Sequence, residues 1–396
     1  MNVYVTGMGM MSAIGNNISQ SLDSLVNSRS GIAPISILNT RHKADFVLGE
    51  VKMTDQDLRE KAQITSDRHT TRTTLFGLFA AQEALNQANY SSNDGIRTGL
   101  ISATTVGGAG TTELYFEDFL AGKKTANFID TEDDGDSTEY LADHFGIKHY
   151  VTTLNTACAS STQAIALAAR MLKSGFIDRV LVGGTDAHCK LTFNGFNSLQ
   201  LLSDVPCRPF DINRKGLNLG EGAAYLVLEN EKSLQKSNNK VLVKLSGYGV
   251  TNDAYHQTSS SPDGAGLHAA MQNALNIANL KAHEIDYVNA HGTATGNNDL
   301  TEGWAIKNLF GSDVSFSSTK GFTGHALAAA GAIEAVISIL CLQNQMKVPN
   351  LNFTQSIEEH QMKPITELEK NVSVKHVLSN SAGMGGACAS VIFSLN

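Results

Sequence analysis

Cysteine, proline and tryptophan are scarce in this chain. Its 396 residues include 5 Cys, 6 Pro and 1 Trp, against 35 Gly. The cysteines are odd in number and form no C-x-x-C pair, which argues against a disulfide framework or a cysteine-based zinc site and indicates a reducing compartment. With 42% hydrophobic and 17% charged residues, the composition is typical of a folded, glycine-rich α/β protein rather than a disordered one.

Long apolar and basic runs are also missing. The N-terminus MNVYVTGMG has no basic segment before a long apolar one, so we expect no signal peptide. The longest apolar stretch, 330–342, contains Glu334 and is too short to span a bilayer. The net charge of −8 should repel nucleic acid and acidic proteins alike, unless a local basic patch overrides it. We therefore expect a cytoplasmic protein with neither membrane nor nucleic acid among its partners, and we interpret the acidic run 130–136 as a solvated loop.

Strand and helix patterns alternate along the chain. Segments 3–9, 99–108 and 179–187 are β-rich and end at glycines, whereas 73–89 and 160–175 show helical apolar spacing. This alternation predicts βαβ units and a mainly parallel, buried sheet. A chain of 396 residues is too long for one ordinary core, which indicates two domains or a duplicated one.

The second half of the chain repeats features of the first. VYVTGMG (3–9) matches VKLSGYG (243–249), and AAQEALNQAN (80–89) matches AMQNALNIAN (270–279) at seven of ten positions. We therefore predict two related halves, 1–240 and 241–396, joined at the surface by the polar segment 229–240. If they pack about a pseudo-twofold axis, the loop-to-helix segment with Cys158 should approach the one with Lys320 and His325.

The string ACAS occurs twice, and its two cysteines stand in different contexts. Cys158 precedes three hydroxyl residues and an apolar helical stripe, so it is predicted at a helix N-terminus. The positive end of a helix dipole favours a thiolate, which makes Cys158 a candidate nucleophile, although a buried structural thiol is the alternative. Cys388 leads from the glycine loop AGMGG into a predicted strand and is interpreted as a core residue.

Two histidines and a lysine stand in loops beside buried elements of the second half. His291 follows the predicted strand YVNA, and α/β folds present chemistry at the carboxyl ends of strands. His325 and Lys320 lie in STKGFTGHALAAAG, just before a predicted helix. A single histidine is more often structural, but together with Cys158 these residues indicate nucleophilic acyl chemistry.

These motifs, taken in order, resemble the β-ketoacyl-[acyl-carrier-protein] synthases of the elongating, Cys-His-His type in the thiolase superfamily. The matching segments cover essentially the whole chain: VYVTGMGMMSAIGNN, NTACASS, RPFDINRKGLNLGEGA (208–223), AHGTATGNND (290–299), SSTKGFTGHALAAAGAIEA (317–335) and SNSAGMGG (379–386). The resemblance implies the thiolase fold, a duplicated α/β architecture in five layers (αβαβα), usually as a homodimer, with a heterodimer of related subunits as the alternative.

The resemblance also implies an acyltransferase, a 3-oxoacyl-[acyl-carrier-protein] synthase, whose catalytic residues would be Cys158, His291, His325 and Lys320. Cys158 would take the acyl chain from the phosphopantetheine thioester of an acyl carrier protein. His291 and His325 would bind the malonyl thioester and stabilise the enolate formed on loss of CO₂. The backbone N–H groups of Cys158 and Met384 would form the oxyanion hole. The product would be an elongated fatty-acid, polyene or polyketide chain.

Several supporting roles follow from the same resemblance. Lys320 is expected to help keep His325 neutral, and Glu302 to pair with Lys320. Thr293 and Thr295 are interpreted as hydrogen-bonding the pantetheine arm, with turn hydroxyls as the alternative. No cofactor of its own and no catalytic metal is expected. A structural monovalent cation or, equally, a hydrogen-bonded network is expected around Asn289, Ala290, Glu334, Ser379 and Asn380.

The chain departs from the family pattern in its glycine loop. Ala382 and Met384 replace aromatic residues, and Cys388 stands where Asn is common. Methionine is slimmer and more flexible than phenylalanine, so we expect altered gating and an unusual acyl chain. Asp253 and His256 resemble part of a second gating loop. Candidates for docking the carrier protein are Lys61, Arg68, Arg72 and Arg208.

Two other functions remain open at this point. The chain could be a non-catalytic partner subunit of the chain-length-factor kind, although such proteins lack the nucleophile. It could also be a degradative thiolase acting on CoA esters, because that class uses a second cysteine near a C-terminal glycine loop, as Cys388 is placed.

Overall fold

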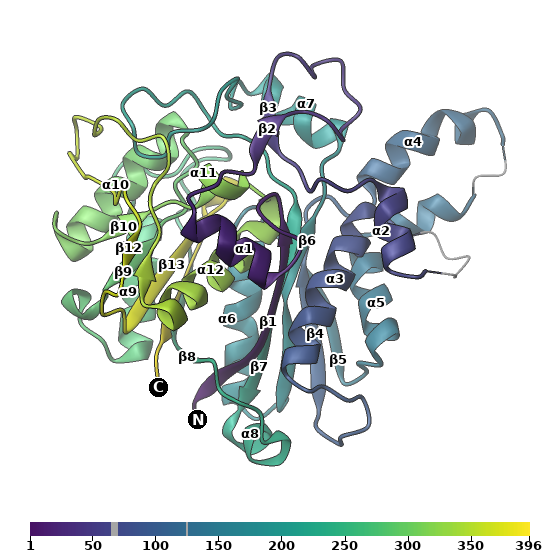
Figure 1. Ribbon diagram of the computed structural model, residues 1–396, viewed down its shortest axis with the longest axis horizontal. Helices are drawn as coiled ribbons and strands as arrows, with labels where there is room; N and C mark the ends of the chain where they lie inside the picture. Colours follow the sequence, from purple (N-terminus) through teal and green to yellow (C-terminus); the bar gives the residue numbers. More distant parts are fainter. Residues whose placement is uncertain (65–69, 124–125) are drawn as a thin grey trace.

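One ten-stranded sheet organises the molecule. The structure is a computed structural model that describes residues 1–64, 70–123 and 126–396 (Figure 1). The strands lie in the order β10 (Phe316–Ser317), β9 (Tyr287–Asn289), β13 (His376–Ala382), β14 (Ala387–Ser394), β8 (Val243–Asn252), β1 (Val3–Ser12), β7 (Gly222–Asn230), β6 (Arg179–Asp186), β4 (Thr98–Ala103) and β5 (Tyr150–Leu154). The two five-stranded halves meet where β1 and β8 pair antiparallel, with Tyr4 opposite Lys244.

The two half-sheets have the same strand directions. From the centre outward, β1–β7–β6 and β8–β14–β13 pair antiparallel, whereas β6–β4–β5 and β13–β9–β10 pair parallel. The sheet is therefore mixed, and the prediction of a mainly parallel sheet was wrong. It failed because β7 and β14 each return beside the first strand of their own half, instead of following a parallel crossover.

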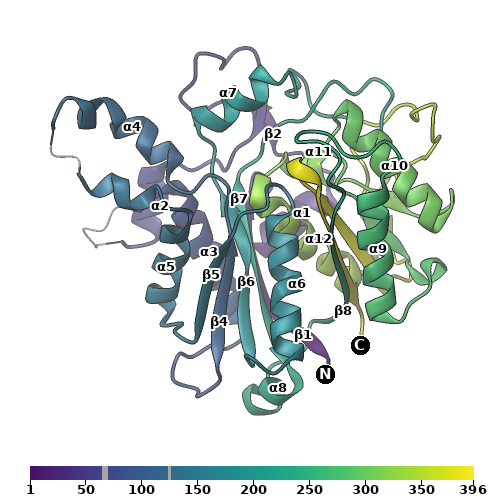
Figure 2. The ribbon, with the colours of Figure 1, turned by 180° about the vertical axis from the view of Figure 1, so that it is seen from behind.

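Five layers stack as helices, half-sheet, helices, half-sheet and helices, as the thiolase fold predicts (Figure 2). The middle layer holds α6 (Ser160–Lys173) and α12 (Ala330–Asn344), which contact strands of both halves. The outer faces are covered by α3 (Arg72–Gln87) and α5 (Asp134–Phe145) on one side, and by α9 (Ala265–Ala278) and α10 (Gly296–Phe310) on the other.

The middle-layer helix α12 is an interior helix. Together with the turn before it, the helical stretch Leu327–Asn344 spans 18 residues and is by length and composition apolar enough to cross a membrane. The expectation that this stretch is too short was therefore wrong by a few residues. This stretch is a core helix of the fold, because 89% of it is buried inside the protein, where it packs between the half-sheets.

Matched glycines show the internal repeat in atomic detail. A Cβ atom added to Gly9 would lie 2.1 Å from the carbonyl oxygen of Ala80 in α3, and one added to Gly249 would lie 1.9 Å from that of Ala270 in α9. The same relation joins Gly7 to Ala84 and Gly247 to Ala274. In each half, the first strand needs glycines so that one outer helix can approach its backbone.

The remaining elements are short and lie around this frame. They are α1 (Ile18–Val26), β2 (Ile32–Pro34), β3 (Val47–Gly49), α2 (Asp55–Lys61), α4 (Ala109–Leu120), α7 (Lys190–Ser198), α8 (Glu231–Ser237), α11 (Lys320–Thr323), β11 (Met346–Lys347) and β12 (Glu369–Lys370). The predicted surface connection 229–240 begins with buried Glu229 and Asn230 at the end of β7 and then forms α8, so only its later part is a connection. The division at residue 240 stays a prediction.

Gly9→Ala is expected to destabilise the fold, whereas Gly195→Ala is not. The added methyl at Gly9 must displace the α3 backbone, and overpacking of this kind costs about 1–3 kcal/mol of unfolding free energy. Gly195, inside α7, has no atom within 4 Å of an added Cβ, so alanine there should leave stability unchanged or raise it by up to about 1 kcal/mol. Urea unfolding followed by circular dichroism measures both, and equal midpoints would contradict the close-packing argument.

Candidate active site

A cavity between the two halves collects side chains from distant parts of the sequence. Cys158 comes from the N-terminal half, and His291 and His325 from the C-terminal half. Around them the cavity is lined by Phe196, Leu199, Leu201, Leu217, Thr258, Ser259, Ser260, Thr293, Thr295, Gly296, Asn297, Asn298, Ala382, Gly383 and Met384. The loop-to-helix segments that carry Cys158 and His325 therefore lie close together, as predicted.

A strained turn holds Cys158 in this cavity. Ala157, just before it, has φ of +53°, a left-handed conformation that is unfavourable for alanine. The Ser160 hydroxyl stabilises the turn by donating to the Ala157 carbonyl (2.5 Å) and accepting from the Thr156 N–H (2.8 Å). The loop after β13 passes so close that a Cβ on Gly383 would lie 3.2 Å from the Cys158 nitrogen.

The Cys158 thiol is protonated at neutral pH. Burial raises its pKa to about 11, although Lys320 and the backbone N–H of Met384 act in the opposite direction. The dipole of helix α6 therefore does not make Cys158 a resting thiolate, and its role as the nucleophile stays a prediction. Helix α6 begins at Ser160, two residues after the cysteine, and burial disfavours the charged sulfur more strongly than these groups favour it.

Two backbone N–H groups are directed at the Cys158 sulfur, namely those of Met384 and of Cys158 itself. Met384 begins the short turn Met384–Gly386, in which Gly385 and Gly386 both have φ of +80°. Glycine adopts this conformation without strain, and the turn it makes here aims the Met384 N–H into the cavity. The N–H groups of Cys158 and Met384, predicted as the donors of an oxyanion hole, therefore both face the Cys158 sulfur.

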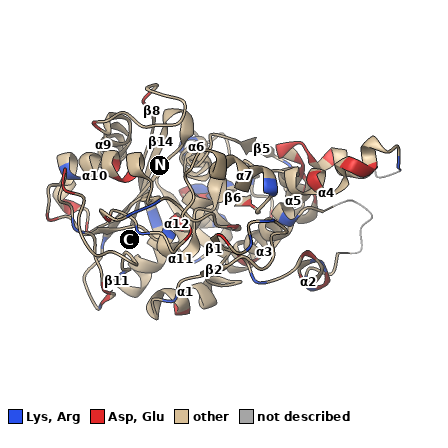
Figure 3. Ribbon diagram, turned by 90° about the horizontal axis from the view of Figure 1, so that it is seen from above, with Lys and Arg blue, Asp and Glu red and all other residues tan. Residues whose placement is uncertain are grey.

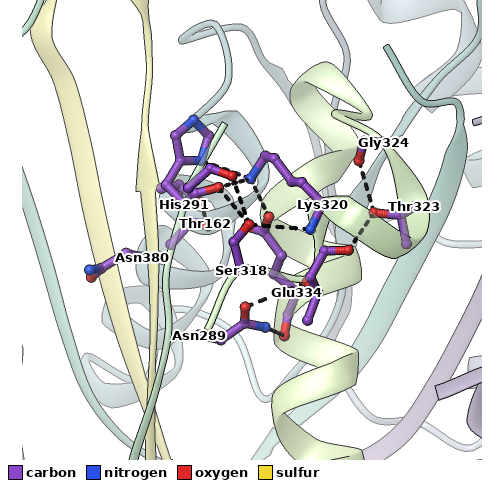
Figure 4. Close-up of polar contacts among 12 residues, drawn as sticks. Thr162, Asn289, His291, Ser318, Lys320, Thr323, Gly324, Glu334 and Asn380 are labelled. Atoms are coloured by element: carbon purple, nitrogen blue, oxygen red, sulfur yellow. Dashed lines mark hydrogen bonds and ion pairs between the residues drawn. The ribbon is translucent and has the colours of Figure 1, made fainter. Parts of the chain in front are cut away.

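Lys320 is buried at the centre of a polar cluster (Figure 4). Its Nζ lies 3.1 Å from His291 Nδ1, donates to the His291 carbonyl (2.5 Å) and forms an ion pair with Glu334 of α12. Because an ammonium group only donates, His291 Nδ1 accepts, and the ring proton of His291 is placed on Nε2. Burial, Lys320 and His325 hold the pKa of His291 well below 6.5, so the ring is neutral.

Glu302 does not pair with Lys320, and that prediction was wrong. Its two carboxylate oxygens accept from the backbone N–H groups of His291 (2.8 Å) and Gly292 (2.7 Å). Glu302 therefore shapes the loop that carries His291, whereas the carboxylate facing Lys320 belongs to Glu334. Sequence spacing could not distinguish the two, because α10 and α12 both follow a loop of the site.

His325 lies next to His291, with ring centroids 5.2 Å apart and planes at 87°. Its backbone is held by the Asn218 carbonyl and the Gly220 N–H, at 2.8 and 2.9 Å. Burial and Lys320 hold the pKa of His325 well below 6.5, in the direction expected if Lys320 helps to keep this ring neutral. No described residue hydrogen-bonds to its Nδ1.

The mouth of the cavity is rich in hydroxyl and amide groups. Thr293 and Thr295, both predicted, face it with their hydroxyls 2.9 Å apart. The segment 258–260 also lines the cavity, which was not predicted. The sequence signal that could have revealed it is the run of hydroxyl residues TSSS at 258–261. The Ser260 N–H donates to Asn297 (2.8 Å), and Asp253 accepts from the Ser261 N–H (3.0 Å), so Asp253 holds this loop rather than facing the cavity.

Asp186, at the end of β6, was also not predicted. It accepts from the Thr104 hydroxyl (2.6 Å) in one half and from the Ala328 N–H (2.8 Å) in the other. Burial raises its pKa to about 6 despite these bonds. A carboxylate directly after the buried strand RVLVGGT is the sequence signal that could have revealed this link between the halves.

The second ACAS cysteine is not part of the cavity. Cys388 lies in β14 and packs in the core beside α9, where its sulfur would lie 3.2 Å from a Cβ on Gly266. It belongs to a cluster of buried apolar residues, as predicted for a core residue.

The residues predicted to dock the carrier protein differ in their exposure. Lys61 is exposed at the end of α2, and Arg208 is half-buried. Arg72 is half-buried and held in ion pairs with Glu221 (2.6 Å) and Asp55 (2.8 Å), so little of its charge is presented to a carrier protein. Arg68 lies outside the described residues.

The residues proposed for a monovalent cation divide between two faces of β13. The Asn289 amide donates to the Glu334 carbonyl (3.2 Å), and buried oxygens of Glu334 and Ser379 have no partner in the described part of the chain. The Asn380 side chain points away from this group in Figure 4. It donates to Glu302 (3.3 Å) and accepts from the Ser390 hydroxyl (2.7 Å). Hard cations bind oxygen atoms, so the oxygens of Glu334 and Ser379 that lack partners fit a monovalent cation. The Asn380 side chain is not available to such a site. The described residues contain no cluster of His, Cys, Asp or Glu suited to a transition metal.

Comparison with known proteins identifies the family. Residues 1–233 match the beta-ketoacyl synthase N-terminal domain, and residues 242–354 match the beta-ketoacyl synthase C-terminal domain. The chain belongs to the β-ketoacyl synthase family. The 3-oxoacyl-[acyl-carrier-protein] synthase 2 of Staphylococcus aureus (strain N315) is 31% identical over 405 residues, covering 99% of this chain and 97% of the relative.

Solved structures agree with this membership. The ishigamide ketosynthase/chain length factor is 28% identical with a TM-score of 0.92, covering 100% of this chain and 99% of the matched one. A type II PKS acyl-carrier protein in complex with its ketosynthase bound to the hexaketide gives 26% identity and a TM-score of 0.89, again over 100% and 99% of the chains. The thiolase fold of this β-ketoacyl synthase is thereby confirmed.

Proposed function

We propose that this β-ketoacyl synthase catalyses a decarboxylative Claisen condensation. An acyl chain held on Cys158 would react with malonyl-[acyl-carrier protein], elongating a fatty-acid, polyene or polyketide chain. One observation carries the proposal: a buried thiol from one half and two neutral imidazoles from the other line the same cavity. That set of groups suits thioester exchange followed by stabilisation of an enolate.

The first step is transfer of the acyl group to Cys158. Its sulfur attacks the thioester carbonyl of the acyl carrier, and the bond between that carbonyl and the carrier sulfur breaks. The Cys158 proton ends on the departing carrier thiol, so a resting thiol with a raised pKa is compatible with the exchange. The backbone N–H groups of Cys158 and Met384 would bind the tetrahedral oxyanion, and such donors are commonly worth about 3–4 kcal/mol each.

The second step forms the new carbon–carbon bond. The malonyl carboxylate leaves as CO₂, and its bonding electrons pass into the enolate, whose oxygen would accept from His291 Nε2–H and from His325. Neutral rings suit this task because they donate without protonating the carboxylate. The enolate carbon then attacks the acyl-Cys158 carbonyl, the carbon–sulfur bond breaks, and the sulfur takes up one proton. Lys320 and Glu302 are positioning residues for His291.

The substrates would arrive on an acyl carrier protein. Thr293 and Thr295, at the mouth of the cavity, are placed to hydrogen-bond a phosphopantetheine arm. The similar structures include a ketosynthase with its carrier protein and a ketosynthase/chain length factor, which supports a carrier partner and a dimeric assembly, homomeric or heteromeric. We further propose a cytoplasmic location, in keeping with five free cysteines. We also propose a structural monovalent cation near Asn289, Ala290, Glu334 and Ser379, where buried oxygens of Glu334 and Ser379 lack partners among the described residues.

The alternative functions fit the site less well. A non-catalytic chain-length-factor-like subunit has no need of a thiol, two neutral histidines and Lys320 in one cavity. A degradative thiolase would place its second cysteine in the cavity, whereas Cys388 packs against α9.

Replacing each ACAS cysteine by serine tests the proposal. Cys158→Ser is expected to lower condensation by about 10³-fold or more and to abolish the acyl adduct, since it removes the nucleophile. Cys388→Ser, its matched control, should keep activity within about threefold. Incubation with a panel of acyl-carrier thioesters, followed by mass spectrometry of the adduct and its site, measures this. An adduct on no cysteine would contradict the condensation, and loss of activity in Cys388→Ser would favour the thiolase.

Met384→Phe is expected to change the preferred acyl length. Met384 lines the cavity beside Cys158, and a bulkier, stiffer ring would take space from the acyl chain. We expect the ratio of long-chain to short-chain condensation to fall by about tenfold, as when a pocket loses room for a methylene or two. Product masses from acyl substrates of graded length give the ratio. Met53→Phe, outside the cavity, is the control, and an unchanged ratio in Met384→Phe would contradict a gating role for this position.

A further inference from the structure

Asp186 is a buried carboxylate to which the proposed chemistry gives no role. Acidic residues are conspicuous on the outer helices α4 and α5 (Figure 3), whereas Asp186 is fully buried at the end of β6. Burying a charge costs several kcal/mol unless hydrogen-bond partners surround it. The partners of this carboxylate therefore indicate what it holds in place.

The donors to Asp186 come from both halves of the chain. One set belongs to the loop after β4 and consists of the hydroxyls of Thr104 (2.6 Å) and Thr105 (2.8 Å) and the N–H groups of Thr105 and Val106 (both 3.0 Å). The other donor is the Ala328 N–H, 2.8 Å from Oδ2. Ala328 lies in the short turn Leu327–Ala329, three residues after His325. Asp186 therefore ties the turn that follows His325 to strand β6 of the other half.

The turn that Asp186 holds is strained. Leu327 has φ of +51°, a left-handed conformation that costs a residue other than glycine about 1–3 kcal/mol and persists only where its surroundings impose it. The bond from the next N–H group, that of Ala328, to a fully buried carboxylate is one such constraint. Close packing is another, because a Cβ on Gly184 of β6 would lie 3.0 Å from the Ala328 carbonyl oxygen.

The two histidines of the cavity are fixed in different ways. The His291 ring is held through its own side chain, because Lys320 donates to its Nδ1 (3.1 Å). The His325 ring lacks such a bond, since its buried Nδ1 has no partner among the described residues. The direction of this ring therefore depends on its backbone. That backbone is held at His325 by the Asn218 carbonyl (2.8 Å) and beyond it by the turn bonded to Asp186.

We propose that Asp186 is the positioning residue for His325: by holding the turn after this histidine, it directs the ring at the place where the enolate oxygen forms. The proposal rests on the decarboxylative condensation put forward above and adds to it a residue of the N-terminal half. It also separates the two steps of that reaction. Acyl transfer to Cys158 uses two backbone N–H groups and does not need Asp186, whereas formation of the enolate from the malonyl thioester does.

Asp186→Asn tests this role through the two partial reactions. The amide has the size of the carboxylate but turns an NH₂ group toward N–H donors, so at least one bond is lost. We expect CO₂ release from malonyl-carrier thioester to fall by about 100-fold, as when a reacting group is misplaced by about 1 Å. Acylation of Cys158, read by mass spectrometry, should stay within about threefold of the parent.

Glu83→Gln is the matched control. The Glu83 carboxylate also accepts from backbone N–H groups, those of Met10 (3.1 Å) and Ile18 (3.0 Å), but it belongs to the outer helix α3 and does not line the cavity. Both partial reactions of this variant should stay within about threefold of the parent. A loss of CO₂ release in Glu83→Gln as large as in Asp186→Asn would overturn the proposal, because the effect would then be general to buried carboxylates.

Thr105→Val is a milder variant that gives the answer even if Asp186→Asn does not fold. It removes one hydroxyl bond to Oδ2, the oxygen that also accepts from Ala328, and should lower CO₂ release by about 3–10-fold with acylation unchanged. Nitrogen-15 NMR of histidine-labelled variant should show changed ring signals for His325 and unchanged ones for His291.

The outcomes separate this role from the proposed function. Unchanged CO₂ release in folded variants, or an equal loss of both partial reactions, would overturn the positioning of His325 by Asp186. A parent protein that takes no acyl group on Cys158 and releases no CO₂ would contradict the condensation itself, and with it this role.

Discussion

One buried ammonium group, that of Lys320, organises the site. Burying a charge costs several kcal/mol unless partners surround it, and here Glu334, the His291 carbonyl and His291 Nδ1 do so. The same group fixes the His291 tautomer. It also lowers the pKa of both histidines, although burial is the larger cause of that shift. It also opposes the effect of burial on the pKa of Cys158. Removing Lys320 would therefore change every group that the proposed chemistry uses.

The duplicated fold is what brings these groups together. Because β1 pairs with β8 at the centre of the sheet, the middle helices α6 and α12 lie side by side in the interior. Close approach there depends on small residues, since a Cβ on Gly331 would lie 2.0 Å from the Thr162 hydroxyl. Each half thus supplies what the other lacks: Cys158 from one, and His291, Lys320 and His325 from the other. The cavity exists only at their interface.

Local sequence patterns were enough to predict helices and to group the cavity residues, but they did not reveal which distant residues contact one another. Periodicity and glycine spacing indicated the helices 73–89 and 160–175 within two residues of their ends, and the motifs placed Cys158, His291 and His325 together. The partner of Lys320 was missed, because Glu302 and Glu334 are equally plausible until α10 and α12 are packed. The raised pKa of Cys158 was missed for a similar reason: burial dominates it, and burial is a property of the whole fold. The cavity mouth at 258–260 depends on a loop that folds back over α10, which no local pattern encodes.

The protonation state of His291 is the most direct test of this arrangement. Nitrogen-15 NMR of histidine-labelled protein, assigned by comparison with His291→Asn, reads the two ring nitrogens separately. We expect a neutral ring with its proton on Nε2 and none on Nδ1, unchanged from about pH 5 to about pH 8. A His291 ring that titrates near the ordinary value of 6.5, or that carries its proton on Nδ1, would contradict the placement of Lys320 as its hydrogen-bond donor.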